Sequence, residues 1–258
     1  MEITSNDNIE EFTKLLCNQY KNKSNELDII SNSLKSVSDI PIELLCKYYT
    51  RIYTDDYFYS NINKDLRENK RNNYLSYIKV LYEGVKLKSL PLSNDKILYR
   101  GSILLNKEIE KIKNYLNKKI ENLPGAIIFS KSFLSFSKDK DIAKYFLNLN
   151  ENKNKEFNKV LFILEKDDNI DYSLSTHADI EELSYFDEKE VLFFPFSSFE
   201  IKNINEINDN NEKIYEIQLL YLGKYIKEFK KDKMQIETKI PDTEFKQEII
   251  KLKIYLVL

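Results

Sequence analysis

The sequence predicts an α+β protein in which a helical N-terminal region precedes a β-rich region. Apolar residues recur at helical spacing through roughly the first 90 residues, whereas after residue 95 they gather into short runs of strand length. Helices first and strands second is the order of an α+β chain, and 258 residues can bury a substantial core. We expect one domain over 1–258, with a helical part at 1–92 and a β-rich core at 93–258.

Four apolar stripes predict the helices of the N-terminal part. The first follows a capping signal at Asp7, and Pro41 opens the third at a first-turn position that needs no backbone N–H. The stripes are Ile9, Phe12, Leu16 and Tyr20; Ile30, Leu34 and Val37; Leu44, Leu45, Tyr48 and Tyr49; and Tyr74, Ile78, Leu81 and Val85.

The β-rich part contains seven apolar runs that predict strands. Two amphipathic stretches between them, 107–120 and 139–148, predict helices, and the polar stretches 148–158 and 205–213 are expected to be loops. The predicted strands are 97–99, 126–129, 160–164, 191–194, 199–204, 214–221 and 249–257.

Composition excludes several classes of function. The 40 basic and 42 acidic residues nearly cancel, so charge gives no case for binding nucleic acid. A single histidine, His177, rules out a multi-histidine metal site, and we expect it to be an ordinary loop residue. Cys17 and Cys46 lie on apolar helical stretches as buried thiols, and their spacing fits no zinc site. No Walker or dinucleotide-binding glycine loop is present.

The chain shows neither a secretory signal nor an apolar stretch long enough to span a bilayer. We therefore expect a cytoplasmic protein without a membrane span, although export by a route that needs no signal is compatible with the sequence.

Arg100 stands near the end of an apolar strand and is followed by Gly101. Such an arginine serves either as a buried ion-pair partner or as a clamp for a diphosphate. The guanidinium suits the second role because it is permanently charged and matches phosphate oxygens with two parallel hydrogen bonds. Gly101 would let a flat ligand approach the backbone closely.

Ser135 and Ser137 lie two residues apart on a predicted strand, so their side chains share one face. Either hydroxyl suits a sugar hydroxyl or a carboxylate. Ser137 is also placed to cap the helix that follows, and the two roles are compatible because Ser135 remains for the site.

Glu188 and Glu190 flank Lys189 at the entry to an apolar strand. Period two predicts both carboxylates on one face and Lys189 on the other. A solvated edge explains such a pair in a chain with 32% charged residues. Glu190, however, directly precedes four apolar residues, which predicts a part-buried carboxylate. Because burying a charge is costly, we expect this carboxylate to have a specific role.

The three motifs in this order resemble the arginine–serine–glutamate class of mono-ADP-ribosyltransferases, in its arginine-specific branch. Residues 48–68 are similar to the helical lead-in of that family, 133–146 to its serine-motif strand and helix, 188–201 to its glutamate-motif strands, and 215–225 to its final strand region. The resemblance covers roughly 40–225. It implies an N-terminal helical region packed on a mixed or antiparallel β-sandwich of the ADP-ribosyltransferase type.

One position departs from the family. Its serine motif usually carries threonine between the two serines, where this chain has Phe136. The middle residue of a strand faces away from its neighbours, so Ser135 should be unaffected, while any contact of the threonine hydroxyl is lost. Residues 1–40 and 226–258 match no segment of the family.

The resemblance implies that NAD is the substrate, that its nicotinamide bond is split and that ADP-ribose passes to a protein arginine, with no metal. Glu190 would stabilise the cation that forms on the nicotinamide ribose, a charge that an enzyme must offset. Ser135 would orient Glu190, and Arg100 would hold the diphosphate. The Gly101 backbone would receive the nicotinamide amide, and Phe146 would either stack on the ring or pack against the sheet.

The resemblance assigns Glu188 to the acceptor arginine. A guanidinium with a pKa above about 12 is a poor nucleophile, so a carboxylate must orient it and take its proton. The loop at roughly 177–187 would face the target protein. Tyr185 and Phe186 are its exposed-aromatic candidates, and simple packing explains them equally well.

Two other functions of this fold stay open. An enzyme that uses water as the acceptor is an NAD glycohydrolase and releases free ADP-ribose. A non-catalytic member binds only a partner protein, but the combined presence of Arg100, Ser135 and Glu190 argues against it. A third reading is a helical interaction module at 1–90 that carries an appended sheet.

Overall fold

The structure, a computed structural model, describes residues 49–54, 56–68, 78, 81, 97–117, 126–149, 156–165, 177–184, 186–195, 197–209 and 212–222. The chain divides into two compact units, Met1–Ser89 with Ile180–Asp187, and Leu90–Asp179 with Glu188–Leu258. The boundary after Ser89 lies close to the predicted boundary at 92/93, but the first unit also receives a later segment. The first two predicted stripes, Cys17, Cys46 and the 249–257 run lie outside the described residues.

The described residues of the first unit between 49 and 68 are largely helical, as the apolar spacing predicts, whereas 180–184 and 186–187 lie outside helices and strands. Residues 49–53 are helical, and α4 (Asp56–Arg67) follows. Tyr49 and Ile62 are fully buried, as is Leu81 of the fourth predicted stripe. Asn63 donates a hydrogen bond from Nδ2 to the Tyr53 hydroxyl at 2.9 Å, which joins α4 to the helical turn before it.

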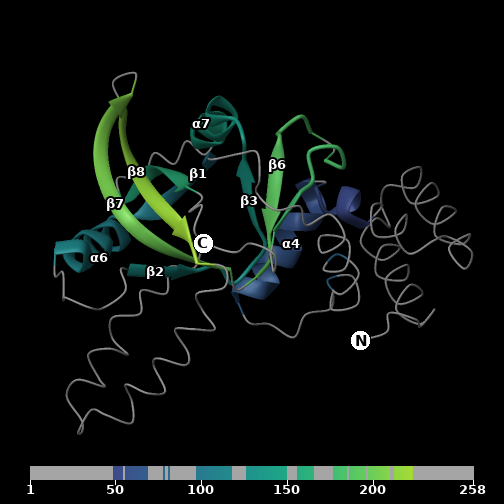
Figure 1. Cartoon of the computed structure of the whole chain (residues 1–258), viewed down its shortest axis with the longest axis horizontal. Helices are drawn as coiled ribbons and strands as arrows, with labels where there is room; N and C mark the ends of the chain where they lie inside the picture. The colour runs from purple at the N-terminus through teal and green to yellow at the C-terminus, as the bar shows by residue number, and fades with distance from the viewer. Residues whose placement is uncertain are drawn as a thin grey trace, which may run out of the picture. The chain divides into compact units, whose positions relative to one another are not determined.

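The second unit is built on an eight-stranded mixed sheet (Figure 1). The strand order is β2-β7-β8-β4-β1-β3-β6-β5, and all neighbours pair antiparallel except β4 with β8. The strands are β1 (Ile97–Leu105), β2 (Ala126–Phe129), β3 (Leu134–Ser137), β4 (Phe157–Glu165), β5 (His177–Asp179), β6 (Glu190–Phe193), β7 (Ser198–Asp209) and β8 (Glu212–Tyr221).

The sheet folds over on itself, so strands distant in its order pack face to face. Phe193 of β6 lies 5.3 Å from Tyr221 of β8, ring centroid to centroid, and Phe136 of β3 lies 5.9 Å from Phe199 of β7. These contacts belong to one buried apolar cluster that draws side chains from both ends of the sheet. The β3-β6-β5 end therefore covers part of the β7-β8 end, and the core lies between them.

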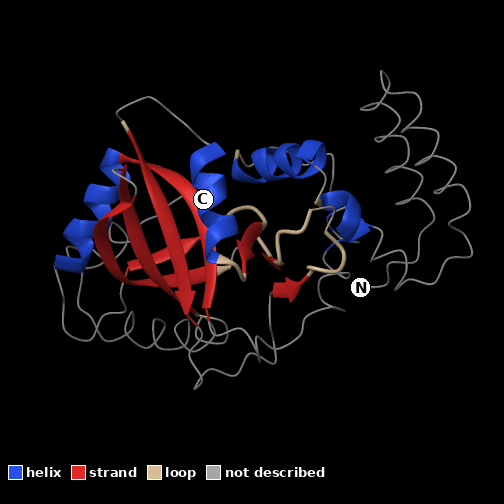
Figure 2. Cartoon of the chain, turned by 90° about the horizontal axis from the view of Figure 1, so that it is seen from above, coloured by secondary structure: helices blue, strands red, loops and turns tan. Residues whose placement is uncertain are grey.

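Two amphipathic helices pack against the sheet (Figure 2). Helix α6 (Asn106–Asn117) buries Ile109 and Ile112, and α7 (Lys140–Leu149) buries Ala143 and Leu147. Helix α6 contacts β1, β2 and β7, while α7 contacts β1, β3 and β4. Both helices begin within one residue of their predicted starts. Among the helices that the structure describes, none has the length and apolarity needed to cross a bilayer.

Two loop predictions are wrong. The stretch 205–213 is mostly strand, because β7 runs on to Asp209 and β8 begins at Glu212 (Figure 1). The Asn205 and Asn208 side chains are exposed while the backbone pairs across the hairpin, for example Asn205 with Glu216. Residues 177–179 form the edge strand β5, which pairs with β6. Backbone pairing with a neighbouring strand of the sheet outweighs turn-forming composition at both places.

Candidate functional site

The three sequence motifs meet on adjacent strands. Tyr99, next to Arg100, pairs with Ser137, and Ser137 pairs on its other side with Glu190. One row of residues thus crosses β1, β3 and β6. Arg100 Nη1 donates a hydrogen bond to the Ser135 carbonyl oxygen at 2.7 Å. Arginine, serine and glutamate motifs, which lie far apart in the sequence, are therefore neighbours in the sheet.

Arg100 is half-buried and links two strands that otherwise meet at a single pair of residues. Its guanidinium contacts the main chain of Ser135, beyond that pair. A guanidinium carries five N–H donors in a planar fork. The bond to Ser135 uses one of its nitrogens.

Gly101 lies under helix α7. A Cβ built at Gly101 would come within 2.1 Å of the Ala143 carbonyl oxygen and 3.0 Å of Leu147 Cγ. The glycine therefore allows α7 to pack directly on β1, a requirement that the sequence did not suggest. The expected approach of a ligand to the Gly101 backbone stays a prediction.

The serine motif alternates as predicted. Phe136 is 2% exposed and packs edge-to-face on Phe193 with ring centroids 5.3 Å apart, in the core. Ser135 and Ser137 occupy the opposite face of β3, which Glu190 shares because it pairs with Ser137. Phe136, in place of the family's threonine, is thus a core residue and leaves the serine face unchanged.

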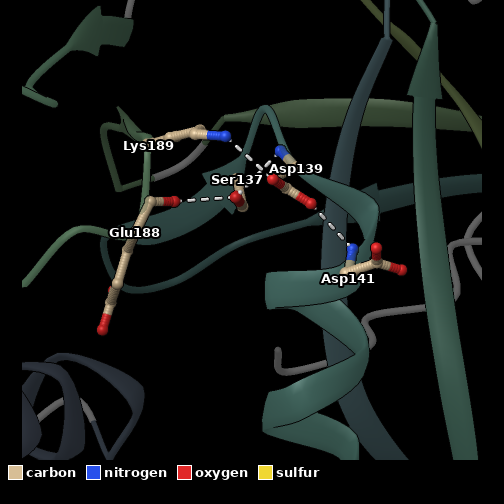
Figure 3. A network of polar contacts seen from close by, with 5 residues as sticks. All are labelled: Ser137, Asp139, Asp141, Glu188 and Lys189. Atoms are coloured by element: carbon tan, nitrogen blue, oxygen red, sulfur yellow. Dashed lines mark hydrogen bonds and ion pairs between the residues drawn. The ribbon is translucent and has the colours of Figure 1, made fainter.

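Ser137 has a different role from the predicted helix cap. Its hydroxyl donates to the Glu188 carbonyl oxygen at 2.7 Å and accepts from the Asp139 N–H at 3.0 Å. The cap of α7 is Asp139, whose Oδ1 accepts the Asp141 N–H at 2.9 Å (Figure 3). Ser137 therefore joins the end of β3 to the glutamate motif.

The glutamate motif enters its strand through a turn. Strand β6 begins at Glu190, and Lys189 has a φ of 47°, in the left-handed region. Period-two alternation does not extend back to Glu188, so the prediction that strand geometry places both carboxylates on one face is wrong. In Figure 3 the Glu188 side chain extends away from Ser137 and Lys189. Glu190 itself is 5% exposed, as its apolar flank predicts.

Phe146 lies on α7 and is half-buried. It meets the exposed ring of Tyr145 edge-to-face, with centroids 6.1 Å apart. Phe186 is 45% exposed in the first unit, and Tyr185 lies outside the described residues. The roles expected of these aromatic residues stay predictions.

His177 is a buried strand residue and not the loop histidine that we expected. Its ring stacks on Phe193 at 4.9 Å and meets Tyr221 edge-on at 5.6 Å. Within the described residues neither ring nitrogen has a hydrogen-bond partner, and burial lowers the pKa of His177 to about 4. The ring is therefore neutral at physiological pH.

Sequence reasoning missed two residues of this region, Asp139 and Lys189. Asp139 carries a readable signal, since an aspartate directly before an amphipathic helix is a preferred cap. Lys189 carries none, because nothing local predicts a left-handed lysine. Across the described ranges, no group of three or more His, Cys, Asp or Glu side chains is arranged to hold a metal ion.

Comparison of folds relates the chain to ADP-ribosyltransferases. The structure of the ADP-ribosyltransferase Vis with the M6 inhibitor matches with a TM-score of 0.50 and 18% identity, over 83% of this chain and 85% of that one. The Vis toxin from Vibrio splendidus matches with a TM-score of 0.49 and 18% identity, over 85% and 88%. HopU1 of Pseudomonas syringae matches with a TM-score of 0.43 and 17% identity, over 62% and 64%.

Sequence comparison adds nothing to this likeness. The chain matches no protein-family model and no curated protein. At 18% identity, the likeness to Vis shows a shared fold alone. The chain thus has the α+β fold of ADP-ribosyltransferases.

Proposed function

We propose that this protein is a mono-ADP-ribosyltransferase that transfers ADP-ribose from NAD to a protein arginine and releases nicotinamide. One observation carries the proposal: Arg100, Ser135 and Glu190, picked out from separate motifs, lie on three adjacent strands of this fold. This adjacency supports a site that combines a cation for phosphates, a hydroxyl and a buried carboxylate.

The first step breaks the bond between the ribose C1′ and the nicotinamide nitrogen. The bonding electron pair leaves with nicotinamide, and positive charge develops on the ribose. Glu190 supplies the opposing negative charge and accepts a hydrogen bond from a ribose hydroxyl. Its burial matters because a fixed charge acts more strongly where water is excluded.

Arg100 and Ser135 position the substrate. The Arg100 guanidinium binds the diphosphate through donors other than the one used on Ser135. Ser135 of β3 lies on the face of the sheet that also carries Glu190 of β6, and it orients the Glu190 carboxylate. The Gly101 backbone binds the nicotinamide amide, and Phe146 stacks on the ring.

The second step forms the bond between C1′ and a guanidinium nitrogen of the acceptor. Glu188 orients the acceptor and takes the proton that the nitrogen loses. Charge and atoms balance, since nicotinamide carries away the electron pair and Glu188 the proton. The assignment of arginine as the acceptor depends on Glu188.

The test is product analysis with labelled NAD and an arginine-rich acceptor protein. We expect label on the acceptor, nicotinamide in equal amount, and an arginine as the modified residue by mass spectrometry. Free ADP-ribose with an unlabelled acceptor would instead identify an NAD glycohydrolase. No consumption of NAD would reject both enzymes and favour a binding protein.

A further inference from the structure

We propose that the ion pair between Lys189 and Asp139 positions Glu188 independently of Glu190, and so sets how ADP-ribose is divided between arginine and water. The proposal rests on the proposed function and assigns Lys189 and Asp139 as positioning residues. It starts from the backbone of Lys189. Its φ of 47° is the only positive φ of a non-glycine residue in the described part of the chain. A residue with a Cβ adopts this region at an energetic cost, so surrounding contacts must hold it there.

Three contacts surround the left-handed residue. The Lys138 N–H donates to the Lys189 carbonyl oxygen at 3.1 Å, and the Ser137 hydroxyl donates to the Glu188 carbonyl oxygen at 2.7 Å. The Lys189 ammonium donates to Asp139 Oδ2 at 2.9 Å. Two of these contacts fix the backbone, and the third fixes the side chain on the same turn.

Asp139 serves both the helix and the glutamate motif. Oδ1 accepts the Asp141 N–H at the start of α7, while Oδ2 accepts the Lys189 ammonium (Figure 3). The hydrogen bond from Lys189 also lowers the pKa of Asp139. An exposed ion pair alone contributes little to stability. Its effect here comes from holding an unfavourable backbone conformation.

The two glutamates are consequently held by different means. Glu190 is fixed by the ladder between β3 and β6, opposite Ser137. The direction of Glu188 depends on the turn at Lys189, since a strand conformation there would send the Glu188 side chain elsewhere. Loss of the turn should therefore displace the acceptor base while the carboxylate that faces the ribose stays in place.

The experiment uses three variants and a control. Lys189→Met removes the charge and keeps the cost of a positive φ. Lys189→Gly removes the charge and also that cost. Asp139→Asn keeps an acceptor for the cap and removes the negative charge. Lys144→Met is the matched control. Lys144 lies on α7, the helix that Asp139 caps, and its ion pair at 2.5 Å is with Asp209 of β7 and not with the glutamate motif.

The measured quantity is the ratio of ADP-ribosyl-arginine to free ADP-ribose. We expect Lys189→Met and Asp139→Asn to lower this ratio about ten-fold, a part of the roughly 10²–10⁴-fold effect of a positioned general base. Nicotinamide release should stay at the wild-type rate. Lys189→Gly should keep a higher ratio than Lys189→Met, and Lys144→Met should keep the wild-type ratio.

Several outcomes would overturn the proposal. These are a wild-type ratio in Lys189→Met and Asp139→Asn, a parallel fall of both products, or equal ratios in the methionine and glycine variants. A parallel fall would mean that the pair only maintains the fold.

A second measurement needs no NAD. The Lys138 amide donates to Lys189, so its hydrogen exchange reports on the turn. We expect faster exchange at Lys138 in Lys189→Met and Asp139→Asn than in wild type and Lys144→Met. If wild type consumed no NAD, the proposed function would fall by itself. Unchanged exchange at Lys138 would separately reject the role of the ion pair.

Discussion

Glu190 has a position that an acidic residue rarely occupies without a reason. It is 5% exposed, at the start of a strand whose other residues are all buried and apolar. Burial of a carboxylate is unfavourable unless its charge is compensated. In the proposed reaction, this carboxylate stabilises the positive charge that develops on the ribose.

Glu190→Gln should therefore lower nicotinamide release by about 10²–10³-fold, the usual effect of removing one electrostatic group from a reaction centre. Glutamine keeps the shape and loses the charge. Nicotinamide release from NAD is the measurement, and a near-native rate would refute the assignment of Glu190.

Glu188→Gln is the companion variant and should act on one product only. Because the proposed role of Glu188 is to serve the acceptor, transfer to arginine should be lost while part of the NAD hydrolysis remains. The measurement is the amount of each labelled product. Arginine labelled at the wild-type rate would show that Glu188 is not the acceptor base.

His177 should make the stability of the protein depend on pH. Burial lowers its pKa from 6.5 to about 4, so the unfolded chain binds a proton more readily than the folded protein. The contribution of the neutral His177 ring to the free energy of unfolding is present above pH 6.5 and is lost as the pH drops towards 4. Linkage gives a loss of about 2 kcal/mol at pH 5 from this residue.

The measurement is urea unfolding of wild type and His177→Phe at pH 7.5 and pH 5. Phenylalanine fits among Phe193 and Tyr221 and does not titrate. The variant should lose about 2 kcal/mol less than wild type on acidification. All other titrating groups cancel in this comparison, so equal losses would contradict the burial of a neutral ring.

At the scale of elements, local pattern places β2 and the faces of β3, but it fails at β5, at the β7–β8 hairpin and at the entry to β6. The predicted strand 126–129 has the same first and last residues as β2. Phe136 faces the core, as its place in the alternation requires. At the entry to β6 the same alternation fails, because contacts with the turn after β3 hold Lys189 in a left-handed conformation.

The packing of α7 on β1 gives a prediction at this scale. Gly101→Ala places a methyl group 2.1 Å from the Ala143 carbonyl oxygen, so helix and strand must separate. Overpacking of this kind costs about 1–3 kcal/mol of unfolding free energy. Ser102→Ala, one residue along β1, adds no atom and is the control. Urea unfolding measures both, and equal stabilities would mean that α7 moves without cost.

At the scale of the whole molecule, the strand order of the sheet brings the candidate residues together. Residues 100, 135 and 190 become neighbours because β1, β3 and β6 are adjacent in the strand order, although β4 and β5 intervene in the sequence between β3 and β6. A ligand that contacts all three strands should stabilise the folded unit as a whole.

NAD should therefore raise the unfolding free energy by about 2.7 kcal/mol at 100 times its dissociation constant. Thermal unfolding with and without NAD measures this shift. Arg100→Lys keeps one positive charge but loses the planar fork that matches phosphates, so its shift should be much smaller at the same NAD concentration. An equal shift in the variant would show that Arg100 does not contribute to NAD binding.

The sequence by itself determined the starts of α6 and α7, the faces of β3 and the burial of Glu190, because these follow from the spacing of apolar residues along a short segment. Only the tertiary structure decided that Gly101 lies under α7, that His177 is buried between aromatic rings, that 205–209 continues a strand and that Lys189 turns the chain. Each of these depends on contacts with other segments of the chain, which outweigh local preference and leave no trace in the local pattern.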